Sequence, residues 1–278
     1  MLAAVRIGID THVNRERIEL NGHAPSVADL RALALLNYGH FTSMQVRDRG
    51  VRGLRLHVQR LVDATRELFG SDLDTDHLRL CMRHALAGDA DASMRVTVYS
   101  RAFDRMNPAP AVDVDVLVSV APPRAAQTSP IRVRSVGYER VLPRIKHVGT
   151  FGLFHHLRVA RLAGFDDALF TTGAGEICEG STWDIGFLDG EQAIWPTAPA
   201  LHGITRQLVE SGLRARGIEV ESRAVFLRDV ERFSSAFALN SAGAARPIVG
   251  VDDMPLQVDA AFTALLADAH DSHPLEAI

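Results

Sequence analysis

The segment Gly175–Thr182, with the sequence GEICEGST, carries two acidic residues around a short apolar pair. If residues 177–179 are extended, Ile177 and Glu179 point to the same face, because side chains alternate along a strand. Glu179 would then share a buried face, and a buried carboxylate needs a cationic or hydrogen-bonding partner. For Glu179 alone, a solvated turn glutamate is the commoner interpretation. The segment makes Glu179 the first candidate site residue.

Hydrophobic periodicity predicts regular elements on both sides of this segment. In the first half it indicates helices at residues 27–36, 54–69 and 77–87 and strands at 41–46, 94–99 and 112–120. In the second half it indicates helices at 151–163, 204–216, 227–234 and 258–269, and strands at 131–136, 167–170, 184–188, 193–195 and 236–239. The alternation has no regular strand–helix–strand rhythm, so the fold class is α+β.

Residues 121–129 contain two prolines and several small polar residues, which is typical of a linker. We therefore predict two domains that meet near residue 124. The N-terminal domain would span residues 1–124 and the C-terminal domain residues 125–278.

Composition and charge exclude several classes of protein. A content of 47% hydrophobic and 23% charged residues is that of an ordinary globular protein. The net charge of −4, with arginines interleaved with acids, gives no basic tract for a nucleic acid or a membrane surface. Residues 1–10 lack the regions of a signal peptide, and no apolar run approaches membrane-spanning length. Cys81 and Cys178 are too few for a disulfide framework or a zinc site. We expect a cytoplasmic protein without a metal.

Lys146 is the only lysine among the thirty Lys and Arg residues of the chain. Arginine stays protonated and cannot form a Schiff base, whereas a lysine amine that loses its proton can attack a carbonyl. On composition alone, a leftover surface lysine is an equally good interpretation. Lys146 is the candidate nucleophile.

Two short segments have the composition of anion sites. Residues 203–206, Gly-Ile-Thr-Arg, begin a predicted helix, where free N–H groups and the Thr205 hydroxyl would face a phosphate. Residues 240–243, Asn-Ser-Ala-Gly, follow a predicted strand, and such a turn can direct amides and the Ser241 hydroxyl at an anion. Each is weak alone, because ordinary helix starts and turns look alike. The sequence has no dinucleotide-binding glycine motif, P-loop or serine nucleophile elbow.

The order of these features resembles a known family, the pyridoxal-phosphate enzymes of fold type IV. This group of class IV aminotransferases joins branched-chain and D-amino-acid aminotransferases with aminodeoxychorismate lyase. The resemblance spans residues 38–251, including Tyr38-Gly39 before a strand and the helix segment His57–Leu61. It implies a two-domain fold with a smaller N-terminal α/β domain and a larger, barrel-like C-terminal α/β domain. It also implies a homodimer.

The resemblance further implies pyridoxal 5'-phosphate as cofactor and a role for each matching residue. Lys146 matches the lysine that holds the cofactor as an aldimine and moves the substrate's α-proton. Glu179 matches the carboxylate that faces the pyridine nitrogen and keeps it protonated. The other matches are Ile204, Thr205 and Ser241 in the phosphate cradle, Ala242 at the substrate carboxylate, and Tyr38 beside the substrate.

Several positions depart from the family pattern. The phosphate-binding arginine of the family falls on Gly53 here, and Arg52, one residue earlier, is its candidate replacement. Asp184 stands where the family has an asparagine. Phe151 replaces the tyrosine that branched-chain aminotransferases carry after the lysine. These changes argue against an unmodified branched-chain aminotransferase.

Three functions remain open at this point. The resemblance implies an aminotransferase that moves an amino group between an amino-acid donor and a 2-keto-acid acceptor through Lys146. An aminodeoxychorismate lyase-like β-elimination that releases pyruvate is the alternative, because it needs the same lysine as a base. A catalytically silent member that binds a cofactor or a partner is the third, motivated by the missing arginine.

Overall fold

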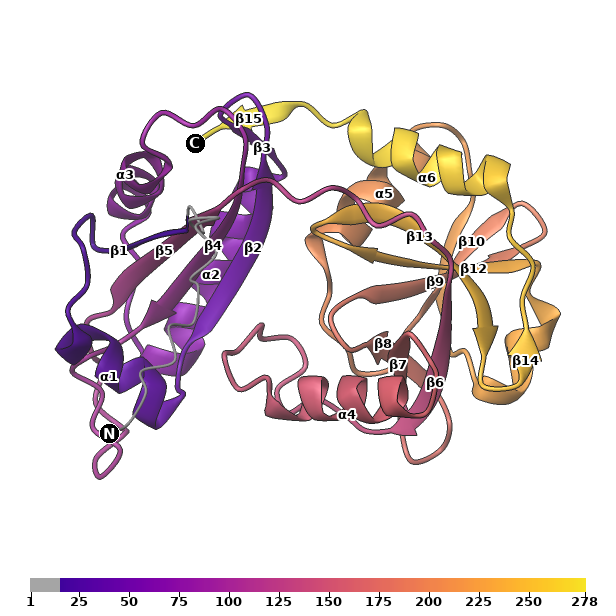
Figure 1. Ribbon diagram of the computed structural model, residues 1–278, viewed down its shortest axis with the longest axis horizontal. Helices are drawn as coiled ribbons and strands as arrows, with labels where there is room; N and C mark the ends of the chain where they lie inside the picture. The colour runs from indigo at the N-terminus through magenta and orange to yellow at the C-terminus, as the bar shows by residue number, and fades with distance from the viewer. Residues whose placement is uncertain (1–15) are drawn as a thin grey trace, which may run out of the picture.

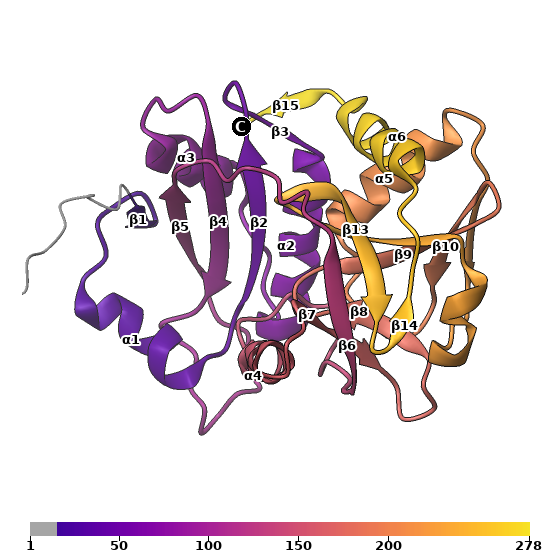
Figure 2. The ribbon, with the colours of Figure 1, turned by 45° about the vertical axis from the view of Figure 1, so that its right-hand side comes forward.

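The alternating strands of the first half form a four-stranded antiparallel sheet in the computed structural model, which describes residues 16–278. Its strand order is β1 (Arg17–Leu20), β5 (Asp115–Ala121), β4 (Ala92–Tyr99) and β2 (His40–Val46). One face packs on α2 (Leu54–Phe69) and α3 (Thr75–Leu86) through residues such as Met44, Val96 and Val118. Figure 2 shows both helices behind the strands. α1 (Val27–Leu36) packs against Leu20, Tyr99 and Leu117 at the sheet's end.

The second half forms a curled nine-stranded mixed sheet around its own apolar core, which contains Phe187, Ile194 and Ile248. The order is β11 (Val220–Arg223), β10 (Gln192–Pro196), β9 (Asp184–Asp189), β12 (Ser235–Asn240), β13 (Gly243–Val251), β6 (Ile131–Gly137), β7 (Asp167–Thr171) and β8 (Ile177–Gly180), with β14 (Met254–Pro255) paired to β13. α5 (Ile204–Arg214) and α6 (Ala260–Asp271) cover one side through Leu213 and Leu266. α4 (Phe151–Leu162) packs on β7.

Two connections join the halves, which lie side by side in Figure 1. Residues 122–130 lead from β5 to β6. At the other end of the chain, β15 (Leu275–Ala277) returns to the N-terminal half and pairs with β3 (Gly50–Arg52). A Cβ at Gly50 would lie 2.9 Å from the Leu275 Cβ, so this close pairing requires glycine. The predicted division at residue 124 assigned β15 to the C-terminal domain, although β15 pairs with a strand of the N-terminal half. The domain boundary itself stays a prediction.

The α+β fold class is confirmed, and most predicted elements are present with ends shifted by a few residues. The segment predicted as a helix at 227–234 is a short 3-10 helix, Leu227–Arg232. Three of the strands that sequence patterns missed, β1, β3 and β15, have four residues or fewer, too few to establish a period. The nine-residue strand β13 was also missed. No helix within residues 16–278 is long and apolar enough to cross a membrane. The prediction for residues 1–10 lies outside the described residues.

Candidate active site

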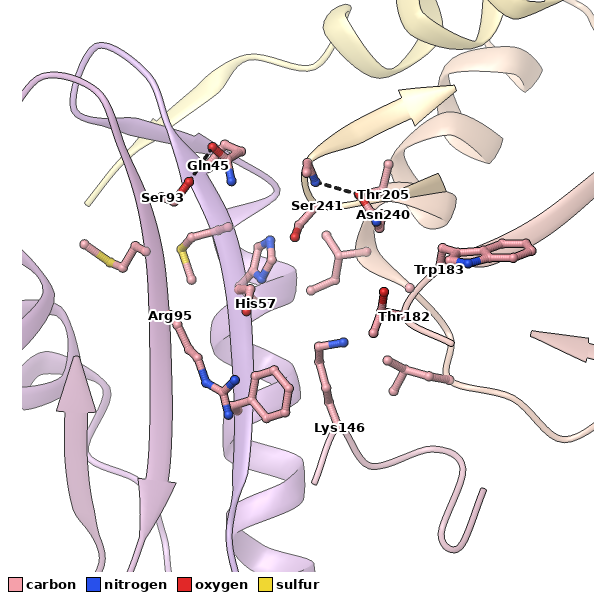
Figure 3. A pocket seen from close by; sticks show the side chains of 18 of the residues that line it. Gln45, His57, Ser93, Arg95, Lys146, Thr182, Trp183, Thr205, Asn240 and Ser241 are labelled. Atoms are coloured by element: carbon pink, nitrogen blue, oxygen red, sulfur yellow. Dashed lines mark hydrogen bonds between the residues drawn. The ribbon is translucent and has the colours of Figure 1, made fainter. Parts of the chain in front are cut away.

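A cavity of about 500 Å³ lies between the two halves and contains the Lys146 side chain (Figure 3). The polar face of the N-terminal sheet forms one wall through residues such as Ser43 and Arg95, and α2 adds His57 and Arg60. Six of the predicted site residues line this cavity: Lys146, Glu179, Ile204, Thr205, Ser241 and Ala242. The fold therefore brings together residues that are almost a hundred positions apart in the chain.

The backbone around Lys146 is held against β2. The Phe41 N–H donates to the Lys146 carbonyl at 2.8 Å, and the Val148 N–H donates to the Gly39 carbonyl at 2.9 Å. At Gly39 a Cβ would lie 2.7 Å from the Val98 carbonyl oxygen, so this approach requires glycine. The Lys146 amine has no hydrogen-bond partner among the described residues and lies 5.1 Å from the centre of the Phe41 ring. The backbone of Lys146 is thus held in place, whereas its amine makes no hydrogen bond within the described chain.

The surroundings of Lys146 favour the neutral amine. Burial, together with the guanidinium groups of Arg60 and Arg140, lowers the pKa of Lys146 from 10.5 to about 7, and Asp184 and Glu179 oppose this lowering. A neutral lysine amine is both a nucleophile and a base. The chemistry predicted for the lone lysine is therefore available near neutral pH.

Glu179 lies on β8 and is 5% exposed, so its carboxylate is buried rather than solvated in a turn. The cationic partner that such a group needs is Arg140, whose Nε lies 3.5 Å from Glu179 Oε1. That oxygen and two nitrogens of Arg140 have no hydrogen-bond partner among the described residues. Burial raises the pKa of Glu179 to about 7, while Arg140 lowers it. The pair therefore leaves a carboxylate oxygen available to a ligand.

The N-terminus of α5 forms another part of the cavity wall, with Gly203, Ile204 and Thr205. Its N-cap residue, Gly203, donates its N–H to Asp184 Oδ1 at 3.2 Å, and no side chain caps the helix. A Cβ at Gly203 would lie 1.9 Å from Asp184 Oδ2, so a capping side chain does not fit. The first amides of the helix stay open to an anion, as predicted for Ile204 and Thr205.

Ser241 and Ala242 form the turn between β12 and β13. Ser241 lines the cavity on the same side as Thr205 (Figure 3). The Ala242 N–H, which was predicted to bind a substrate carboxylate, donates to Asn240 Oδ1 at 2.9 Å. A substrate carboxylate would have to share or replace that contact.

The structure does not bring Arg52 and Tyr38 to the Lys146 cavity. Arg52 donates to the His273 carbonyl at 3.1 Å and forms an ion pair with Asp271. It lines a neighbouring cavity instead. Tyr38 stacks on Phe103 with ring centres 4.4 Å apart, and its hydroxyl donates to the Leu68 carbonyl. Tyr38 lines neither cavity, whereas the cavity that Arg52 lines shares Ile204, Thr205 and Ser241 with the Lys146 cavity.

Sequence reasoning missed several charged groups in the cavity. Arg60 is part of the quoted helix segment 57–61, but its place in the cavity was not predicted. Arg95 alternates with the core residues Met94 and Val96, so the period of two indicates that it faces away from the core. Its guanidinium carbon lies 3.6 Å from the centre of the Phe41 ring. Arg140 belongs to no helix or strand, and no local pattern identifies it.

Comparisons with known proteins match most of the chain. The family model described as amino-transferase class IV matches residues 39–251. The probable branched-chain-amino-acid aminotransferase of Rickettsia bellii is 27% identical over 214 residues, which is 72% of this chain and 73% of that protein. The structure of the branched-chain aminotransferase from Thermoproteus uzoniensis with norvaline has a TM-score of 0.80 at 20% identity, covering 91% of this chain and 93% of that one. A hypothetical aminotransferase from Mycobacterium tuberculosis in a PLP-bound form has a TM-score of 0.77 at 18% identity, covering 92% and 98%.

Proposed function

Because the chain belongs to the class IV aminotransferase family, we propose that it transfers an amino group between an amino acid and a 2-keto acid, with pyridoxal phosphate attached to Lys146. The observation that carries this proposal is the Lys146 amine, which has no partner among the described residues and a pKa of about 7. An amine in that state can bond to a carbonyl near neutral pH. The PLP-bound form of the M. tuberculosis protein supports the choice of cofactor.

The groups around Lys146 fit the parts of this cofactor. The unpartnered Glu179 oxygen suits a protonated ring nitrogen, and the open N-terminus of α5 with Thr205 and Ser241 suits a phosphate. When bound, pyridoxal phosphate supplies an electron-withdrawing ring that stabilises negative charge at the substrate's α-carbon. Lys146 would then take the α-proton on its amine and return it to the cofactor carbon.

Substrates of this class carry a carboxylate, and the cavity offers a cation for it. Arg95 lies exposed on the wall formed by the N-terminal sheet and pairs with no carboxylate in the described chain. We infer that Arg95 binds a carboxylate of the amino donor or the keto acid. An Arg95→Met variant should raise KM for a dicarboxylic donor more than for an aliphatic monocarboxylic one.

We also propose that two copies of the chain associate. The helix α4 presents large apolar side chains to solvent, with Phe151 81% exposed and Leu162 72% exposed. Such a patch on a soluble protein marks a contact surface. Light scattering that gives the mass of one chain at all concentrations would refute this dimer.

The deciding experiment is borohydride reduction of the purified protein after incubation with pyridoxal phosphate. Peptide mass analysis should place the reduced cofactor on Lys146, and L- and D-amino acids with 2-oxoglutarate should then reveal the donor. Lys146→Arg keeps a long basic side chain but cannot form the bond, so it should lose both labelling and turnover.

The other outcomes identify the competing functions. Release of pyruvate from aminodeoxychorismate without amino transfer would establish the lyase. A chain that takes up no pyridoxal phosphate would refute both enzymatic functions. Turnover by Lys146→Arg would remove Lys146 from the mechanism.

A further inference from the structure

Two cavities meet at the N-terminus of α5. The first contains Lys146, and the second has a volume of about 330 Å³. The residues that line both are Met44, Gln45, His57, Ile204, Thr205, Asn240, Ser241 and Ala242. Within the described chain, this shared wall contains no Lys or Arg, and His57 has its only titratable side chain. The cationic side chains of the second cavity, Arg47 and Arg52, lie outside this shared wall, whose own donors are neutral.

His57 presents one unpartnered ring nitrogen to this junction. The residue lies in the first turn of α2 and is 5% exposed. Its Nδ1 lies 2.6 Å from the Thr42 Oγ1 atom. Its Nε2 has no hydrogen-bond partner among residues 16–278. In Figure 3 the ring extends into the cavity from α2, and Ser241 and Thr205 lie on the C-terminal half across from it.

The hydrogen bonds behind the ring determine where its proton lies. Arg60 Nη2 donates to Thr42 Oγ1 at 2.6 Å, and a guanidinium group has no acceptor. The single proton of the Thr42 hydroxyl, which is fully buried, has Nδ1 of His57 as its acceptor in the described chain. Leaving that proton unpaired would be costly. Nδ1 is therefore an acceptor, and in a neutral ring the proton lies on Nε2.

The ring is held in the neutral form. Burial is the main cause, and Arg60 and Lys146 add like-charge repulsion, so the pKa of His57 lies well below 6.5. A neutral imidazole with Nδ1 occupied has one donor left, the Nε2–H. That donor is directed at the junction between the cavities.

We propose that His57 donates its Nε2–H to the phosphate of the cofactor, and that Thr42 is a positioning residue that fixes this tautomer. The inference rests on the proposed function, because it needs a phosphorylated ligand at α5. Together with the Thr205 and Ser241 hydroxyls and the α5 amides, His57 completes a cradle made of neutral donors. Thr42 lines neither cavity and contacts the junction through His57, while it also accepts a hydrogen bond from Arg60.

The tautomer is tested directly by NMR of the apoprotein labelled with ¹⁵N-histidine. The His57 signals are assigned by their loss in His57→Phe. They should show a protonated Nε2 and an unprotonated Nδ1 through the range near pH 6.5 in which exposed histidines titrate. Addition of inorganic phosphate should shift the Nε2 signal more than the Nδ1 signal. Thr42→Val should mix the tautomers, and Thr42→Ser, which keeps the hydroxyl, should restore the original pattern.

The contact with phosphate is tested by comparing the affinities of the apoprotein for pyridoxal phosphate and for pyridoxal. Loss of one hydrogen bond to a charged group corresponds to roughly a tenfold to hundredfold loss of affinity. We expect His57→Phe to weaken binding of pyridoxal phosphate by this factor and to leave pyridoxal binding nearly unchanged. Thr42→Val should show a smaller loss that Thr42→Ser reverses.

Failure of the inference differs from failure of the proposed function. A wild-type chain that binds neither pyridoxal phosphate nor pyridoxal would refute the proposed function, while the tautomer and its response to inorganic phosphate would still be measurable. Equal losses for both ligands in His57→Phe would mean that the ring only fills space. A proton on Nδ1 of wild-type His57, or no effect of phosphate on Nε2, would overturn the inference.

Discussion

Replacing Lys146 with methionine should stabilise the apoprotein although it removes the proposed nucleophile. Folding lowers the pKa of Lys146 from 10.5 to about 7. Converted at about 1.4 kcal/mol per pH unit, this lowering costs about 5 kcal/mol of folding free energy below pH 7. This net cost already contains the attraction of the ammonium to Glu179 and Asp184. We therefore expect Lys146→Met to be more stable than wild type by up to about 5 kcal/mol below pH 7.

The pH dependence makes this prediction specific. Between pH 7 and 10.5 the unfolded chain holds the Lys146 proton and the folded chain does not, so wild-type stability contains a component that rises with pH. The Met variant lacks that component. Its advantage should therefore shrink by about 1.4 kcal/mol per pH unit across this window. Below pH 7 the advantage should be constant.

Urea unfolding of the apoproteins at a series of pH values and a fixed chain concentration measures this difference. Arg144→Met is the matched control, because Arg144 is an exposed cation two residues away that pairs with Glu67 at the surface. The control should change stability by less than about 1 kcal/mol at every pH. A Lys146→Met variant that is less stable than wild type below pH 7, or an advantage that does not fall with pH, would refute the reasoning.

Three further substitutions test the rest of the site. Arg140→Met leaves the buried Glu179 carboxylate without its cation and should destabilise the chain by about 3 kcal/mol at alkaline pH. The loss should be smaller below pH 7, because Glu179 then takes up a proton. An equal loss at both pH values in urea unfolding would contradict this. Asp184→Asn keeps an acceptor for the Gly203 N–H but removes a carboxylate whose pKa is raised to about 6 by burial. Because the ionised carboxylate repels a phosphate at the start of α5, affinity for pyridoxal phosphate should rise several-fold above pH 6. Well below pH 6 the affinity should stay unchanged. Gly203→Ala places a Cβ against Asp184 and should lower stability by about 1 to 3 kcal/mol and weaken cofactor binding. Gly173→Ala is the control, because a Cβ there meets open space, and it should change thermal unfolding very little.

The predictions that succeeded rest on local rules. For the GEICEGST segment, alternation indicated that Glu179 would share the face of Ile177 if the backbone were extended, and β8 meets that condition. The commoner interpretation, a solvated turn glutamate, was wrong, since Glu179 is buried. The open start of α5 followed from Gly203 and the residues after it. Such features depend on a few neighbouring residues, so the sequence alone indicates them.

Residues whose contacts lie far along the chain were not predictable in this way. Arg52 is captured by carbonyls more than two hundred residues away, because β15 pairs with β3 and brings the C-terminal segment over it. Arg140 meets Glu179 only after the second sheet has curled. Propensity and periodicity contain no information on such pairs. The family pattern did not reveal Arg140 either, since it identifies the groups that contact the cofactor rather than those that surround them.

The charged groups in the cavity give a reason why the apoprotein and the cofactor-bound protein should differ in stability. Lys146, Arg140 and Glu179 are each shifted by burial or left with unpartnered atoms, and each shift opposes folding of the empty chain. A ligand that bonds to the amine and accepts or donates at the free atoms removes several of these costs together. The stabilisation by this ligand should therefore exceed the value expected for the same contacts in water. It should be smaller in Lys146→Met, which no longer buries the Lys146 charge. Cofactor affinity and the instability of the empty site thus have one physical origin, the removal of these three side chains from water.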